Sequence, residues 1–317
     1  MNRRILAAVV TGIISGSLCQ VSNRGNGSAR VDFMWSLSAA RDLLAGRDVY
    51  APEANFDLIP YPLPAALVAL PLAPLPLPLG ASLFVGTTSG LLAFGLVRNG
   101  EWWRLLTFAS APYCLAVRCV QWSPLMMAIL FFPALMPLVL VKPQFALPVA
   151  LTRLTRRRVV ACLCFLLASL AIDPTWPTRW LPQIKPYGGF IPALVFPVLL
   201  LPVYRWREPG VRHFLLMACM PQHRYLYDSL LLWTIPASFR EMLALTFTSW
   251  IACVAGFFLV GFREHGAALM VAGIYLPCLV LLLTRPARSP EESRPATTSE
   301  APSGEREEIV IETIVIK

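Results

Sequence analysis

Charged residues are scarce in this chain. They make up 14% of its 317 residues, against about 25% in soluble domains, while hydrophobic residues make up 56%. This composition excludes an ordinary soluble domain and predicts a protein that crosses a membrane several times. The formal net charge is +9, but the arginines and lysines stand in short runs between apolar segments. Such runs set topology in a membrane, so the charge does not indicate a nucleic-acid partner.

The sequence signatures of several protein classes are also missing. There is no glycine-rich nucleotide loop of Walker or Rossmann type, which argues against a nucleotide-sugar donor and against an ATP-driven pump. There is no HExxH and no GxSxG, so nothing favours a hydrolase. The eight cysteines form no CxxC and no paired Cys/His spacing. We therefore interpret them as small hydrophobic residues in helix packing rather than as disulfides or zinc ligands.

The apolar segments predict an all-α, polytopic transmembrane bundle of about nine to eleven spans, with short broken helices and an outer juxtamembrane helix. Several segments are shorter than the roughly 20 residues that a helix needs to cross a bilayer. The first segment is expected to be a retained span, because no small-residue cleavage site follows it. The segments are residues 5–21, 62–79, 81–97, 105–117, 125–141, 145–151, 159–172, 190–203, 214–220, 225–235, 243–260 and 267–283.

The basic runs predict the orientation and the domain division. Positive residues prefer the cytoplasmic side, which places residues 22–61, 173–189 and 222–228 outside. Residues 62–142 hold either a full span or a re-entrant pair at their start. Residues 1–284 form the membrane domain, and residues 285–317, rich in Pro, Ser, Thr and Glu, form a cytoplasmic tail expected to be disordered. The basic runs are Arg3-Arg4, Arg153 with Arg156 to Arg158, Arg205 to Arg212, and Arg285 with Arg288.

Asp32 begins a predicted helix that follows the first span. Phe33, Leu37, Ala40 and Leu44 recur at helical spacing, so this helix is expected to lie flat on the membrane surface. The polar residues of the stretch face elsewhere, and they are Ser36, Arg41, Asp42 and Arg47. Asp32 suits the N-cap, and Gly46, just past the end, suits the C′ position. Capping alone explains the aspartate. A carboxylate at the edge of a membrane cavity is also placed to take a proton from a hydroxyl, and both roles stay open.

Two further stretches carry charge beside apolar segments. Lys142 precedes Pro143, and an ammonium at a helix break inside a membrane is costly unless it meets an anion or reaches the surface by snorkelling. The turn 222–228 holds His223, Arg224 and Asp228 between two short segments, which favours a turn that lines a cavity. Asp228 either holds Arg224, orients a sugar hydroxyl or helps to bind a metal.

Weaker candidates lie elsewhere. The loop 172–189 is either an interfacial belt or a sugar-binding loop, and it carries Trp176, Trp180, Arg179, Lys185 and Tyr187. Gln121, beside Trp122 and near Arg118, is a possible sugar or phosphate contact. His213 and His265 are interpreted as ordinary loop residues.

The order of these features resembles that of a known enzyme family. The matching residues are, in order, Asp32, Trp35, Ala39-Ala40 and Gly46 to Tyr50; Tyr61-Pro62 with Pro64; residues 71–76; Gln121; Lys142-Pro143-Gln144 followed by Arg156 to Arg158; and Tyr227-Asp228. This series is similar to that of the bacterial polyprenyl-phosphate-mannose-dependent mannosyltransferases, glycosyltransferase family 87, which have the GT-C fold. The chain departs from the family pattern where Val120 replaces the glycine usual before the glutamine, and where "YPLP" replaces a double proline after tyrosine.

The resemblance implies a GT-C enzyme of the cytoplasmic membrane whose active site faces outside. Such an enzyme transfers a sugar, usually mannose, from a polyprenyl-phosphate carrier to a hydroxyl of a glycan or glycolipid, with inversion. Asp32 would be the general base, and cations would stabilise the phosphate leaving group. No cofactor is implied beyond the lipid-linked donor, and the need for a divalent metal stays open. The expected substrate-binding residues are Tyr61, Gln121, Lys142, Gln144, His223, Arg224, Tyr227 and Asp228, and Lys185 is a further candidate cation.

Two other classes fit parts of the pattern. A transporter or flippase of lipid-linked sugars would also use broken helices and buried charges. A noncatalytic membrane scaffold would need none of the polar residues to act.

Overall fold

The computed structural model describes residues 2–24, 32–51, 61–184, 189–223, 225–258 and 264–286. Residues Met1–Arg285 form one compact unit, and within the described residues this unit is all-helical apart from one isolated bridge between Phe190 and Gln222. The expected all-α class is therefore confirmed for this part of the chain. The tail predicted for residues 285–317 lies outside the described residues beyond Pro286.

Alpha helices (α) are interspersed with 3₁₀ helices (η) along the described chain. In chain order they are α1 (Arg3–Arg24), α2 (Asp32–Leu44), α3 (Leu63–Ala69), η1 (Leu70–Leu72), α4 (Leu77–Leu96), η2 (Trp102–Ala109), α5 (Ala111–Arg118), α6 (Ser123–Phe131), η3 (Pro133–Val141), η4 (Pro143–Phe145), α7 (Ala146–Arg153), α8 (Arg156–Ile172), α9 (Trp176–Trp180), η5 (Leu181–Gln183), α10 (Pro192–Val195), η6 (Pro197–Arg205), α11 (Pro209–Cys219), η7 (Tyr227–Thr234), α12 (Phe239–Phe258) and α13 (Glu264–Thr284).

Four of the described helices are long and apolar enough to cross a membrane. They include Arg3–Asn23 of α1, Leu77–Leu96 of α4, Phe239–Phe258 of α12 and Gly266–Thr284 of α13. A fifth crossing is possible if α8 and the following Trp176–Gln183, which are bent by 83°, count as one broken span. The protein is thus a helical membrane protein. The larger number of nine to eleven spans stays a prediction.

Three segments expected as single helices are each divided in two. Phe132 separates α6 from η3, and Phe196 separates α10 from η6. Both residues leave the helical backbone region directly before a proline, as the steric clash with the proline ring requires. In the third case, Ser110 ends η2 and caps α5 by accepting a hydrogen bond from the backbone of Tyr113 at 3.3 Å. Residues 62–79, expected as either a full span or a re-entrant pair, are divided among α3, η1 and the start of α4.

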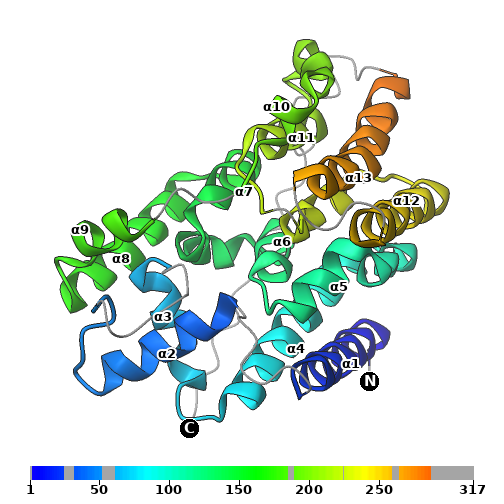
Figure 1. Cartoon of the computed structure of the whole chain (residues 1–317). Helices are drawn as coiled ribbons and strands as arrows, with labels where there is room; N and C mark the ends of the chain where they lie inside the picture. The colour runs from blue at the N-terminus through cyan, green and yellow to red at the C-terminus, as the bar shows by residue number, and fades with distance from the viewer. Residues whose placement is uncertain are drawn as a thin grey trace, which may run out of the picture. The chain divides into compact units, whose positions relative to one another are not determined.

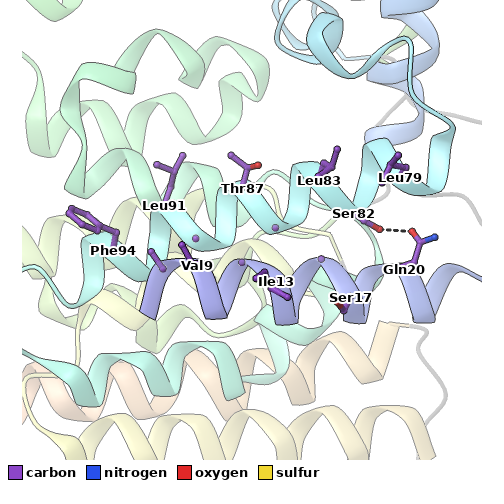
Figure 2. Close-up of a pocket in the computed structure, with 15 residues that line it drawn as sticks. Val9, Ile13, Ser17, Gln20, Leu79, Ser82, Leu83, Thr87, Leu91 and Phe94 are labelled. Atoms are coloured by element: carbon purple, nitrogen blue, oxygen red, sulfur yellow. Dashed lines mark hydrogen bonds between the residues drawn. The ribbon is translucent and has the colours of Figure 1, made fainter. Parts of the chain in front are cut away.

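Helices α1 and α4 pack against each other in close backbone contact at their glycines. A Cβ atom added to Gly12 would lie 2.8 Å from the carbonyl oxygen of Gly86, and one added to Gly86 would lie 2.9 Å from that of Gly12. Spacing of small residues by four along both helices permits this approach, as in other membrane helix pairs. An open, largely apolar groove of about 800 Å³ runs along the pair (Figure 2). Near one end of the groove the Ser82 hydroxyl donates to the Gln20 side-chain oxygen at 2.7 Å.

Helix α6 lies at the centre of the fold, with α4 and α5 near it and α12 and α13 beyond them (Figure 1). Residues Ser123 to Leu130 of α6 are all buried. Two long 3₁₀ helices, η3 and η7, pack against it. Lys142 directly follows η3, and η7 begins with Tyr227 and Asp228. The N-terminal end of α6 and the end of η3 therefore lie close to the start of η7, which is distant from both in the chain.

Two of the predicted cytoplasmic arginines meet at one end of the fold. Arg205 donates to the carbonyl oxygens of Leu282 at 2.7 Å and Arg285 at 3.0 Å, and it pairs with Glu208. Arg285 pairs in turn with Glu241 of α12. These residues share one end of the molecule, and the side of the membrane that this end faces stays a prediction.

Candidate functional site

Helix α2 is present as expected but is more deeply buried than an amphipathic surface helix. Leu44, assigned to the apolar face, is 65% exposed, whereas Ser36, assigned to the polar face, is fully buried. The predicted pattern was wrong here because α3 and α4 both pack against α2, so more than one face of α2 is buried. Phe33 stacks on Phe84 of α4 with ring centroids 4.1 Å apart. Gly46 has a φ of +67° and ends the helix, as predicted.

The carboxylate of Asp32 makes contacts far beyond its own helix. Asp32 is the first residue of α2 and is half-buried. Its Oδ2 atom accepts hydrogen bonds from the hydroxyls of Tyr61 at 3.0 Å and Tyr227 at 3.3 Å. Its backbone N–H donates to the carbonyl oxygen of Cys119 at 3.2 Å. Helix capping alone therefore does not account for the side chain, which two phenols from distant segments orient.

Aromatic rings surround this carboxylate. Tyr61 lies 6.3 Å from both Trp35 and Trp122, measured between ring centroids, and Trp35 lies 5.7 Å from Tyr50. The Tyr50 hydroxyl donates to the backbone oxygen of Tyr61 at 3.0 Å. Burial raises the pKa of Tyr50, and the charge of Asp173 raises it further, so Tyr50 stays a neutral donor. The rings hold Tyr61 in place beside Asp32.

Lys142 and Asp228 form a buried ion pair next to this group. Their side chains are 2% and 1% exposed, and the Lys142 Nζ atom lies 2.8 Å from both Asp228 carboxylate oxygens. Ser123, at the start of α6, donates to Asp228 Oδ1 at 2.5 Å. The Lys142 ammonium also donates to Gln121 Oε1 at 3.4 Å. Mutual pairing and these hydrogen bonds compensate for the removal of both charges from water.

This pairing answers the alternative for Lys142, whose ammonium meets an anion inside the protein. Lys142 is too deeply buried to snorkel to a surface. Asp228 holds Lys142, a partner that sequence reasoning did not propose, and the expected partner Arg224 lies outside the described residues. Among the described residues no group of three His, Cys, Asp or Glu side chains is placed to hold a metal ion. Sequence reasoning also missed Ser123, the first residue of α6, because no local pattern marks it as a partner of Asp228.

Strained backbone flanks the site on two sides. Val120 and Leu226, each with a φ of +50°, are the non-glycine residues with positive φ in the described part of the chain. Val120 precedes Gln121, and Leu226 precedes Tyr227. A left-handed conformation is unfavourable for a β-branched residue such as valine and persists only where the surrounding structure enforces it. Glycine is the residue that adopts this conformation without cost.

We expect the free energy of unfolding of Val120→Gly to be about 1 kcal/mol higher than that of Val120→Ala. Alanine is strained in the left-handed backbone conformation at this position, whereas glycine is not. Both variants remove the buried side chain, so their difference isolates the backbone. The free energy of unfolding in mixed detergent micelles measures it. The same two substitutions at Val85, which lies inside α4, are the control and should show the opposite order. Equal stability of the two Val120 variants would contradict strain at this position.

The turn before η7 is anchored from inside the protein. The backbones of Gln222 and Phe190 exchange two hydrogen bonds of 2.9 Å. The Gln222 side-chain amide donates to the backbone oxygen of Met217 at 3.0 Å and to the Tyr275 hydroxyl at 2.5 Å. His223 stacks on Tyr227 with centroids 5.4 Å apart. Gln222 therefore anchors the start of the expected turn, whose Arg224 lies outside the described residues.

The loop after α8 is tied to the end of α2. Arg179 pairs with Asp48 at 2.5 Å and with Asp173. Trp176 is 5% exposed, and its indole N–H donates to Ser169 at 3.2 Å. Trp176 is therefore a packing residue in this structure and not an exposed belt or sugar platform.

The remaining expected residues have varied positions. Gln144 is half-buried in η4, two residues after Lys142. His213 was wrongly interpreted as a loop residue: it is 4% exposed, within α11, and contacts the backbone oxygen of Leu231 at 3.3 Å. His265 lies in α13, and its side chain lies outside the described residues. Lys185 and Tyr187 also lie outside them.

Cys119 lies beside Asp32 but is unsuited to act as a nucleophile. Burial, and then the nearby Asp32 carboxylate, raise the pKa of the Cys119 thiol to about 12. The thiolate is the reactive form of cysteine, and it is disfavoured here.

The structure connects most of the expected residues into one cluster. Asp32, Tyr61 and Tyr227 share hydrogen bonds, and Tyr227 links them to Lys142 and its partners, because the Lys142 Nζ atom lies 5.0 Å from the centroid of the Tyr227 ring. No family model matches this chain, and no curated protein or solved structure matches it. The family resemblance therefore stays an interpretation of ordered motifs. The functional argument rests on the geometry of this cluster.

Proposed function

We propose that this protein is an inverting membrane glycosyltransferase, with Asp32 as its general base. The observation that supports the proposal is that one half-buried carboxylate is oriented by two phenols contributed by separate segments, Tyr61 and Tyr227. A carboxylate used only as a helix cap needs no such partners. A general base needs a fixed direction, because proton transfer requires hydrogen-bond geometry toward the acceptor.

In the proposed reaction a polyprenyl-phosphate sugar, with mannose the expected sugar, is the donor. The acceptor hydroxyl of a glycan or glycolipid loses its proton to Asp32 while its oxygen forms a bond to the anomeric carbon. The bond between that carbon and the phosphate oxygen breaks from the opposite face, and polyprenyl phosphate leaves as an anion. The geometry is that of an inverting glycosidase, with the acceptor in place of water.

Among the residues that the structure describes, His223 is the candidate for contact with the leaving phosphate. It is half-buried and stacked on Tyr227, and its Nδ1 atom accepts a hydrogen bond from the backbone of Tyr225 at 3.4 Å. The proposal assigns the His223 imidazole, which this stacking holds beside the Asp32 cluster, to the leaving phosphate. The proposal places the protein in the cytoplasmic membrane, with this site toward the outside.

A transporter of lipid-linked sugars is the second candidate, and the buried Lys142–Asp228 pair favours it. Ionisable pairs inside membrane domains often mark substrate or proton pathways. Such a protein would move the lipid-linked sugar between leaflets without breaking the sugar–phosphate bond.

Membranes that contain the wild-type chain should transfer label from radiolabelled polyprenyl-phosphate-mannose into a lipid extract. Asp32→Asn should reduce this transfer at least about a hundredfold, because the amide cannot accept the proton. Asp48→Asn is the matched control. It lies beyond the same helix, is partly exposed, and asparagine can still accept the Tyr50 backbone hydrogen bond.

The outcomes separate the two candidates. Equal transfer by wild type and Asp32→Asn removes Asp32 from the chemistry. If the wild type transfers no label but moves the intact labelled lipid between the leaflets of reconstituted vesicles, the protein is a transporter and not a transferase.

A further inference from the structure

The Lys142 ammonium is enclosed by its own protein. Its contacts are the two Asp228 oxygens at 2.8 Å, Gln121 at 3.4 Å, and the ring faces of Phe145 and Tyr227, each 5.0 Å from Nζ to the centroid. An ammonium has three N–H donors, and these oxygens account for them. A phosphate that approached Lys142 would also meet the negative charge of Asp228. A lysine that binds an anionic substrate would need N–H donors directed toward the substrate, whereas those of Lys142 are directed toward Asp228 and Gln121.

The ion pair is connected to Asp32 through one residue. Tyr227 directly precedes Asp228, offers its ring face to Lys142, and donates from its hydroxyl to Asp32 at 3.3 Å. The preceding residue, Leu226, has the left-handed φ of +50°, a conformation that must be enforced by its neighbours. The buried ion pair fixes Asp228, the residue that directly follows Tyr227. Its geometry therefore sets where the Tyr227 hydroxyl lies.

We infer that Lys142 and Asp228 are positioning residues that hold Tyr227 against Asp32 and do not bind the donor phosphate. The inference rests on the proposed function, in which Asp32 takes the acceptor proton. The pair acts on the base through the Tyr227 hydroxyl. Loss of the pair should therefore slow the chemical step and leave the affinity for the lipid-linked donor unchanged.

The double variant Lys142→Met with Asp228→Leu tests this without leaving an unpaired buried charge. In the transfer assay we expect kcat to fall at least about tenfold, since small misplacement of a catalytic group has effects of this size. We expect the KM for polyprenyl-phosphate-mannose to stay within about twofold. Tyr227→Phe should reproduce the loss in kcat. The control is Arg47→Met with Asp42→Leu, which neutralises another ion pair, at the far end of α2, and should change neither constant.

A second measurement reads the position of Tyr227 without any transfer. In the full chain with 3-fluorotyrosine at position 227, the ¹⁹F resonance should shift on Asp32→Asn. In the double variant Lys142→Met with Asp228→Leu, the same ¹⁹F resonance should broaden or split. Adding Asp32→Asn to that double variant should then leave the resonance unshifted. A rise in KM with unchanged kcat, or a ¹⁹F spectrum unaffected by loss of the pair, overturns the inference. If the wild type transfers no sugar, the proposed function has failed, and the spectrum alone still decides the positioning role.

Discussion

Replacing Lys142 alone by methionine should lower the free energy of unfolding by about 3–5 kcal/mol, because it leaves the Asp228 carboxylate buried without its counter-charge. Asp228 is 1% exposed, so water does not compensate for the loss. Ser123 continues to donate to it, but one hydroxyl does not replace an ammonium at 2.8 Å from both oxygens. Unfolding in mixed detergent micelles measures the change.

The double variant Lys142→Met with Asp228→Leu should recover most of that stability, because apolar side chains of similar volume often replace a buried ion pair without loss. Arg47→Met is the control for the single variant. It breaks the Arg47–Asp42 pair, whose arginine side chain is 64% exposed, and should cost less than about 1 kcal/mol. A double variant as unstable as Lys142→Met would show that the pair itself, and not the uncompensated charge, stabilises the fold.

Gly86→Leu should lower the free energy of unfolding by about 3 kcal/mol, since overpacking at a backbone contact forces two helices apart. The first side-chain carbon alone would lie 2.9 Å from the Gly12 carbonyl oxygen of α1. That oxygen is part of a helix backbone and cannot move aside as a flexible side chain would. Thermal unfolding in detergent, followed by helical circular dichroism, measures the loss.

Thr87→Leu is the matched control for this prediction. Thr87 is the next residue of α4, lines the groove in Figure 2 and is exposed, so a leucine there meets open space. Its stability should stay within about 0.5 kcal/mol of the wild type, as is usual for surface substitutions. If Gly86→Leu were equally harmless, α1 and α4 would not pack through their glycines.

Local chemistry explains which parts of the fold were predictable. The spans at residues 5–21, 81–97, 243–260 and 267–283 follow from hydropathy, and each corresponds to one long helix. The end of α2 follows from Gly46, because glycine adopts positive φ without strain. The breaks at Phe132 and Phe196 were predictable in principle, since each precedes a proline. The glycines that pack α1 against α4 recur at a spacing of four, a packing signal that the sequence analysis did not use.

The face pattern of α2 was not predictable in the same way. An apolar period of 3.6 identifies one buried face, but α2 is covered from more than one direction, so Ser36 became buried. Trp176 likewise is an aromatic residue near a predicted membrane interface. Its inward packing became known only from its burial and its hydrogen bond to Ser169 in the structure.

The sequence by itself determined that this is a helical membrane protein, and its ordered motifs drew attention to Asp32, Lys142 and Asp228. Hydropathy, helix ends and proline effects act within a few residues, so a linear reading captures them. Only the tertiary structure decided that Lys142 pairs with Asp228 and that Tyr61 and Tyr227 orient Asp32. These partners lie 29 to 195 residues apart in the chain. Charge compensation and hydrogen-bond geometry depend on distances in space, which no local pattern contains.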